Sequence, residues 1–151
     1  MLGTDKAVLL DTDVFSALYV TRREIGLKQG HPIDSWMATL TGFRLLIAFQ
    51  TRAELLAGAY LANWGERRLT GLHGQLDLTP TVDEDVEVVD AYARLHADAR
   101  KSGHPLGHKR DHVGDRWIAA CAIAKGLPLM TGNRRHFENA PGLTLLDSPN
   151  A

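Results

Sequence analysis

Two aspartates follow a short apolar run near the start of the chain. Residues 7–10 (AVLL) are apolar, and Asp11, Thr12 and Asp13 come directly after them. An acid at the carboxyl end of a buried strand stands where α/β folds place nucleophiles and metal ligands. The structural alternative is a helix N-cap, because Asp and Thr are both good caps. We expect one of the three residues to cap the next helix, which leaves the others available for chemistry.

Two further acids stand near the starts of predicted helices. Asp115 shares one helical face with the apolar residues Ile118, Ala119, Ala122 and Ile123. A carboxylate is costly to bury on such a face unless it is paired or binds a cation. Its structural alternative is an interaction with the helix dipole, with Arg116 or Lys109 nearby. Glu54 follows Thr51 at the spacing of a capping box, so it either caps a helix or points toward the strand edge.

Carboxylates gathered at one point need a cation or a shared proton, because like charges repel strongly in a low-dielectric cleft. Oxygen ligands suit Mg²⁺ or Mn²⁺, which keep several of their waters. Such an ion lowers the pKa of a bound water and neutralises charge on a phosphodiester. The seven histidines show no HExxH or comparable pattern, so we expect no zinc site. A P-loop and a G-x-G-x-x-G fingerprint are absent, which argues against nucleoside-triphosphate and dinucleotide chemistry.

The elements that must position these acids alternate along the chain. The predicted strands are residues 7–10, 44–49, 76–79, 127–131 and 143–146. The predicted helices are residues 14–20, 32–40, a long helix opened by Thr51, 65–75, a helix capped by the 81–84 segment and running to about 101, 112–125, and a turn over 133–139. This alternation predicts an α/β fold with a mostly parallel sheet of four to five strands flanked by helices. Asp11 follows the first predicted strand and Asn133 the fourth, so both are expected at the sheet edge where ligands bind.

The composition is typical of one globular domain spanning residues 1–151. Apolar residues are 44% and charged residues 23% of the chain. No apolar run is long enough to span a membrane and no secretory signal is recognisable, so we expect a cytoplasmic protein with no membrane partner. The single cysteine, Cys121, excludes an internal disulfide.

Basic residues are clustered although the net charge is only −1. One cluster is Arg22, Arg23 and Lys28, a second is residues 100–110, and a third is residues 134–136. Each cluster either contacts nucleic-acid phosphates or is a solvated loop that happens to be basic.

Three segments, in order, resemble the PIN-domain family. They are VLLDTDVFSAL (residues 8–18), TRAELLAGA (51–59) and GDRWIAACAIAKGLPLMTGNRRHF (114–137). The third is the most specific, because it joins D-x-x-I-A-A, a glycine stop, an apolar strand and T-x-N-x-x-x-F. The resemblance covers residues 8–147 and is strongest to the VapC-type toxins of bacterial toxin–antitoxin pairs. It implies a three-layer PIN-like fold.

The resemblance also implies roles for individual residues. Asp11 and Asp115 would be the main ligands of Mg²⁺ or Mn²⁺, and Glu54 would complete the pocket as ligand or base. The fourth position, often Asp in this family, is Asn133, which leaves open whether one or two ions bind. Four neighbours would support these residues. Thr12 and Thr131 would assist the acids without binding the ion themselves, and Asp111 would be an auxiliary acid or a helix-start residue. The resemblance assigns no particular role to Asp13.

The activity implied is that of an endoribonuclease that cuts RNA phosphodiester bonds and inhibits translation. A cognate antitoxin would silence it, and a homodimer is the expected state. Basic residues would position the RNA through phosphate contacts: Arg22, Arg23, Lys109, Arg110, Arg134 and Arg135.

Two other interpretations remain open at this point. The segment from Val8 to Val14 fits the D-x-D-x-[TV] signature of haloacid-dehalogenase-type phosphatases, with Asp11 as nucleophile and Asp13 as general acid/base. Such an enzyme has an acid pair after its fourth strand, where this chain has Gly132 and Asn133. The same Asn133 keeps open a PIN-fold module that binds RNA or protein without cutting.

Overall fold

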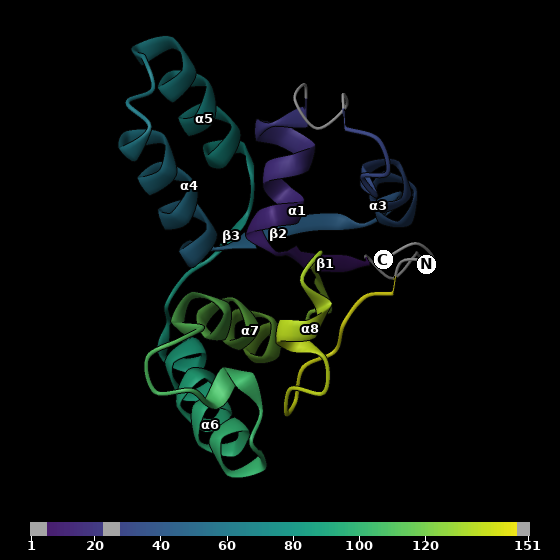
Figure 1. The fold of residues 1–151 in the computed structure, drawn as a ribbon, viewed down its shortest axis with the longest axis vertical. Helices are drawn as coiled ribbons and strands as arrows, with labels where there is room; N and C mark the ends of the chain where they lie inside the picture. The colour runs from purple at the N-terminus through teal and green to yellow at the C-terminus, as the bar shows by residue number, and fades with distance from the viewer. Residues whose placement is uncertain (1–5, 23–27, 148–151) are drawn as a thin grey trace.

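A parallel sheet lies between two layers of helices in the computed structural model, which describes residues 6–22 and 28–147 (Figure 1). The strands pair in the order β3-β2-β1-β4, and every pair is parallel. They are β1 (Ala7–Leu10), β2 (Arg44–Ala48), β3 (Thr81–Val82) and β4 (Leu129–Met130). The strand order reverses at β1, so the carboxyl ends of β1 and β4 border the crevice where such sheets bind ligands. The predicted α/β fold with a mostly parallel sheet is confirmed.

Helices cover both faces of the sheet. They are α1 (Thr12–Phe15) continued by the π-helical turn η1 (Ser16–Val20), α3 (Ile33–Leu40), α4 (Phe49–Leu61), α5 (Glu66–Leu78), α6 (Val86–Ser102), the 3₁₀ turn η2 (Pro105–Gly107), α7 (Val113–Lys125) and α8 (Arg134–Phe137). Figure 1 shows α6 and α7 on one side of the sheet and α1 and α3 on the other. None of the helices in the described part combines the length and hydropathy that a membrane span requires.

Alternating strand residues build one core on each face. Leu9 and Ala48 point into the core shared with α6 and α7, whereas Val8, Leu10 and Ile47 point into the core shared with α1, α3 and α5. Because the sheet is parallel and covered on both faces, its strand residues are mostly apolar, with Arg44 and Thr81 at the starts of β2 and β3 as the polar exceptions. The central strand β1 is therefore packed on both faces. Asp11 follows its last residue, Leu10, at the carboxyl edge of the sheet.

The start of α6 and the end of α7 follow ordinary capping chemistry. Asp85 caps α6 by accepting a hydrogen bond from Val88 N at 2.9 Å. The predicted stop of α7 at Gly126 is confirmed, with a left-handed φ of +63°. Cys121 is buried in α7, and this burial raises the pKa of its thiol to about 12.

Several local predictions were wrong. Helix α4 begins at Phe49 rather than Thr51, with Ala48 as its N-cap, so no capping box joins Thr51 to Glu54. Residues 76–78 end α5 instead of forming a strand, and residues 81–82 form β3, so Asp85 rather than Thr81 caps α6. The predicted last strand is reduced to one bridge between Leu129 and Leu145. In each case tertiary packing outweighs the local pattern.

Candidate active site

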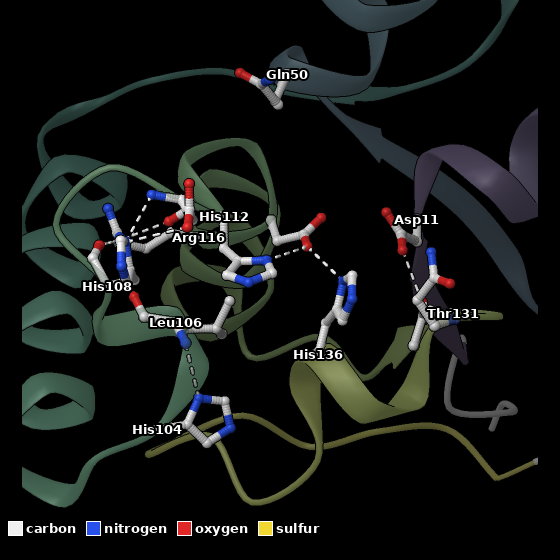
Figure 2. A network of polar contacts seen from close by, with 12 residues as sticks. Asp11, Gln50, His104, Leu106, His108, His112, Arg116, Thr131 and His136 are labelled. Carbon is white, nitrogen blue, oxygen red and sulfur yellow. Dashed lines mark hydrogen bonds and ion pairs between the residues drawn. The ribbon is translucent and has the colours of Figure 1, made fainter.

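Asp11 is buried at the junction of β1 and α1. It is the N-cap of α1, and one of its oxygens accepts a hydrogen bond from Thr12 N at 2.8 Å. The other oxygen, Oδ2, accepts from the Thr131 hydroxyl at 2.7 Å, as Figure 2 shows. The residue is only 3% exposed. Asp11 is thus both the expected cap and a carboxylate held at the crevice between β1 and β4.

Three carboxylates influence one another at this crevice. Burial raises the pKa of Asp11 to about 7, with further increases from the charges of Asp13 and Asp115, against the opposing hydrogen bonds from Thr131 and Thr12. Burial is also the main cause of the raised pKa of Asp13, and the charge of Asp115 adds to it. A buried carboxylate surrounded by other acids is stabilised when a cation enters. The all-oxygen donor set fits a hard divalent ion.

Asp13 has both oxygens engaged by backbone amides. Val14 N donates to Oδ1 at 2.8 Å, and Gly132 N donates to Oδ2 at 3.0 Å. A Cβ at position 132 would collide with Asp13 Oδ2 and lie 3.1 Å from the Trp36 ring, so a side chain there would displace the Asp13 carboxylate. Asp13 therefore ties the turn after β4 to the start of α1.

Glu54 reaches the same crevice from the second turn of α4. Thr12 Oγ1 donates to Glu54 Oε2 at 2.6 Å, and Gln50 Nε2 donates to Oε1 at 3.3 Å. A Cβ on Gly114 would lie 2.8 Å from Glu54 Oε1, so this carboxylate rests against the start of α7, next to Asp115. Of the two alternatives for Glu54, the structure has the one pointing toward the sheet edge.

The hydroxyl of Thr12 connects the first acid segment to the second. It lies 2.9 Å from the hydroxyl of Thr51, a fully buried residue in the first turn of α4, while donating to Glu54. Thr51 was expected as a helix cap, but its hydroxyl serves this contact. Thr12 is consequently positioned to orient Glu54 rather than to approach the crevice itself.

Asp115 lies in the first turn of α7 and contacts two histidines. Its Oδ2 is 2.9 Å from His136 Nδ1 and 3.6 Å from His112 Nδ1. Figure 2 shows both rings directed at this one carboxylate. The sequence search missed both histidines. His112 was detectable because it precedes Asp115 by three residues, but His136 belongs to α8 and gave no local signal.

Asn133 lies close to the Asp11 carboxylate, whereas Asp111 contacts other residues. Asn133 is exposed just past β4, and its backbone N–H donates to Thr131 Oγ1 at 2.9 Å, so it stands beside the Asp11–Thr131 pair. Asp111 is exposed and lies 3.5 Å from His108 Nδ1. Its backbone and side chain contact His108 in the same loop, and its carbonyl oxygen accepts a hydrogen bond from Arg116 of α7 at 3.3 Å.

The predicted basic residues are distributed around the site unevenly. Lys109, Arg110 and Arg135 are exposed, as is Arg22 near the end of η1. Arg134 instead donates to Leu146 O at 3.4 Å and Asp147 Oδ1 at 3.0 Å, so its charge is partly engaged. Arg23 lies outside the described residues. A shallow hollow of about 260 Å³ is lined by the turn after β4, Gly132, Asn133, Arg134, Arg135 and His136.

Arg116 follows Asp115 in the chain but does not pair with it. It is 1% exposed, and its guanidinium donates to Leu106 O at 2.6 Å and to the Tyr92 hydroxyl at 2.9 Å. It also donates to the backbone carbonyls of His108 and Asp111. This buried cation therefore fixes the loop that carries Lys109 and Arg110, a role that sequence reasoning did not detect.

The chain is similar to known proteins in sequence and in fold. Residues 8–143 match the PIN domain. The tRNA(fMet)-specific endonuclease VapC of Salmonella typhimurium is 30% identical over 104 residues, which are 69% of this chain and 75% of that protein. A structure of VapBC2 from Rickettsia felis, bound to a promoter DNA fragment, superimposes with a TM-score of 0.71 at 19% identity, covering 92% of this chain and 96% of that one. VapBC-5 from Mycobacterium tuberculosis, of the VapBC family of toxin–antitoxin systems, superimposes with a TM-score of 0.60 at 25% identity, covering 93% and 97%. The chain belongs to the PIN-domain family, within its VapC branch.

Proposed function

We propose that this chain is a VapC-type endoribonuclease toxin that hydrolyses RNA phosphodiester bonds with Mg²⁺ or Mn²⁺. The observation that carries the proposal is the buried Asp11, whose pKa of about 7 reflects burial and the nearby charges of Asp13 and Asp115. A buried carboxylate with other acids close by is stable in its ionised form when a cation offsets the negative charge. The position at the reversal of strand order supports the same conclusion.

The acids of this chain would have separate roles in the reaction. Asp11 and Asp115 would hold the ion, and Glu54 would accept the proton of the attacking water or add a ligand. When bound, the ion supplies a water of lowered pKa and neutralises charge on the phosphate. Thr131 and Thr12 hold the carboxylates of Asp11 and Glu54 in fixed orientations through hydrogen bonds of 2.7 and 2.6 Å. Preorganisation of this kind places ligands without reorganisation at the moment of reaction.

RNA would be positioned by cations on the loop before α7 and on α8. Lys109 and Arg110 lie on the loop before α7, and Arg135 lies on α8, all exposed. Contacts from such residues to phosphates orient a nucleic acid without reading its sequence. The Salmonella relative is named for cleavage of one transfer RNA, so transfer RNA is the first substrate class to test. Kinship with VapBC-5, of a toxin–antitoxin family, supports a cognate antitoxin as partner, and a homodimer stays a prediction.

A phosphatase mechanism fits the geometry less well. Asp13 would have to act as general acid/base, yet both of its oxygens accept backbone N–H groups, from Val14 and from Gly132. That arrangement is typical of a carboxylate that organises a turn.

The decisive experiment compares cleavage of total transfer RNA by the wild type, Asp11→Asn and Asp115→Asn, with Mg²⁺, Mn²⁺ or EDTA. We expect cleavage by the wild type with either ion and loss of cleavage in EDTA and in both variants. Asp90→Asn serves as the matched control, because Asp90 is exposed and pairs with Arg94 of the same helix, α6. Cleavage by Asp115→Asn at the wild-type rate would contradict the proposal. Binding of RNA without any cleavage would instead favour a non-catalytic PIN module.

A further inference from the structure

Two imidazole rings and one carboxylate converge at the start of α7. His112, Asp115 and His136 each offer a ligand atom, and these atoms lie within 4.8 Å of one another. The two rings lie edge to face with their centroids 4.9 Å apart, and Figure 2 shows both facing the carboxylate. All three side chains are partly exposed, at 31%, 23% and 43% respectively, so an ion and its waters have access.

The orientation of these two rings differs from that of other histidines in the chain. His31, His104 and His108 each use Nδ1 to accept backbone N–H groups, at 3.0 to 3.2 Å, and so stabilise their own turns. His112 is the N-cap residue of α7, yet its side chain makes no capping hydrogen bond. The Nδ1 atoms of His112 and His136 face Asp115 instead, which leaves them directed at a common point.

The backbone conformation of His112 also supports a ligand-binding role for these side chains. His112 has a φ of +62°, in the left-handed region, whereas an N-cap residue ordinarily has an extended backbone. The left-handed region is unfavourable for a residue other than glycine, because its Cβ comes too close to the backbone. Strain of this kind is concentrated at ligand-binding and catalytic positions, where it directs a side chain.

We propose that His112, Asp115 and His136 form a binding site for a divalent transition-metal ion of the Zn²⁺ and Co²⁺ class. Imidazole nitrogen suits these ions, whereas Mg²⁺ requires oxygen. Ligands about 2.1 Å from such an ion lie roughly 3.0–3.4 Å apart at tetrahedral or octahedral angles. The observed separations of 2.9 and 3.6 Å between Asp115 Oδ2 and the two nitrogens bracket that range. Three protein ligands leave positions open for water or phosphate.

This site goes beyond the proposed nuclease pocket, although the two share Asp115. The nuclease pocket is made of carboxylates and selects a hard ion, while the histidine site selects a softer one. Because the two sites use one carboxylate in common, an ion held by the histidines lies next to the crevice that receives RNA. Binding of the ion can be measured without RNA, so it is tested independently of cleavage.

The test is a Co²⁺ titration of the full chain followed by visible absorption, with equilibrium dialysis against Zn²⁺ as a second measurement. We expect one ion per chain, with affinity lowered at least about tenfold by His112→Gln and by His136→Gln. Asp11→Asn should retain Co²⁺, and millimolar Mg²⁺ should not displace it. Circular dichroism of each metal-free variant establishes that it is folded.

His108→Gln is the matched control, because His108 faces Asp111 with the same three-residue spacing and a similar distance of 3.5 Å, but no second histidine is recorded with that pair. Equal loss of Co²⁺ in His108→Gln and His136→Gln would overturn the proposal, as would complete displacement by Mg²⁺. Should a glutamine variant fail to fold, nitrogen NMR of the wild type decides the question. Zn²⁺ must then shift the ring signals of His112 and His136, and unchanged signals overturn the site. Failure of RNA cleavage alongside Co²⁺ binding would reject the nuclease and keep this site.

Discussion

The Thr131 hydroxyl donates a hydrogen bond to Asp11 Oδ2 over 2.7 Å, joining residues 120 positions apart in the chain. The hydroxyl oxygen of Thr131 also accepts a hydrogen bond, from Asn133 N at 2.9 Å. Backbone pairing supports the contact, because Asp11 N donates to Met130 O at 2.8 Å. One hydroxyl therefore connects the end of β1, the end of β4 and the turn that carries Asn133.

Thr131→Val should slow RNA cleavage without unfolding the protein. The change keeps the volume and removes the donor to a charged acceptor, a hydrogen bond of about 1.5–3 kcal/mol. We expect the rate to fall at least about tenfold at saturating Mg²⁺, because the Asp11 carboxylate loses its fixed orientation. Thr131→Ser, which keeps the hydroxyl, should recover most of the rate in the same assay. A wild-type rate in Thr131→Val would show that this contact does not orient Asp11 for catalysis.

The stability of the metal-free protein should fall as the pH rises through the range in which Asp11 ionises. Burial raises its pKa from 3.8 to about 7, so the folded state favours the protonated form. The stability from this group is complete below about pH 4 and is lost as the pH approaches about 7, for a total on the order of a few kcal/mol. Urea unfolding in EDTA at several pH values measures it. Asp11→Asn should lack this loss, and Mg²⁺ should restore stability to the wild type at pH 8. Parallel pH profiles of wild type and variant would contradict the expectation.

Gly114→Ala should lower activity by moving Glu54. The added methyl would lie 2.8 Å from Glu54 Oε1 and 3.0 Å from Gln50 Nε2, both at the ends of flexible side chains. The fold should therefore tolerate the substitution while the carboxylate shifts away from the start of α7. The measurement is the cleavage rate beside thermal unfolding.

Gly74→Ala is the control for that substitution. Gly74 lies inside α5, with nothing within 4 Å of an added Cβ. Alanine there should raise stability by about 0.5–1 kcal/mol and leave cleavage unchanged. Full activity in Gly114→Ala would mean that the position of Glu54 is not critical.

The sequence was sufficient to predict where the first acid stands. An apolar run ending in Asp11, alternating helices and strands, and a glycine stop at residue 126 are local signals, and all three appear in the structure as expected. The position of Glu54 could not be decided, because it depends on where α4 begins. The helix starts after Ala48, which makes no side-chain cap and so leaves no signal in the sequence.

The histidines around Asp115 illustrate a second limit of sequence reasoning. His136 reaches Asp115 because α8 folds back against α7, which is a tertiary contact between residues 21 positions apart. Motif spacing describes ligands within one helix or turn and does not describe such pairs. The same holds for Arg116, whose burial could not be inferred from a charged residue beside an acid.

Arg116→Met should destabilise the protein and disorder the basic loop before α7. The substitution keeps much of the side-chain volume but leaves the buried Leu106 carbonyl and the other acceptors of the guanidinium without a donor. Each unsatisfied buried acceptor costs about 1–3 kcal/mol, so we expect a loss of about 2–4 kcal/mol in the free energy of unfolding. Urea denaturation measures that loss, and a weakened affinity for RNA should accompany it, since Lys109 and Arg110 lose their support.

Arg94→Met separates burial from charge in the same experiment. Arg94 is 77% exposed and pairs with Asp90 on its own helix at 2.7 Å. A solvated surface pair of this kind contributes little, so removing it should scarcely change stability. The two variants lose the same charge, and any difference between them therefore reports the buried hydrogen bonds of Arg116. Equal stabilities would mean that those bonds do not hold the loop.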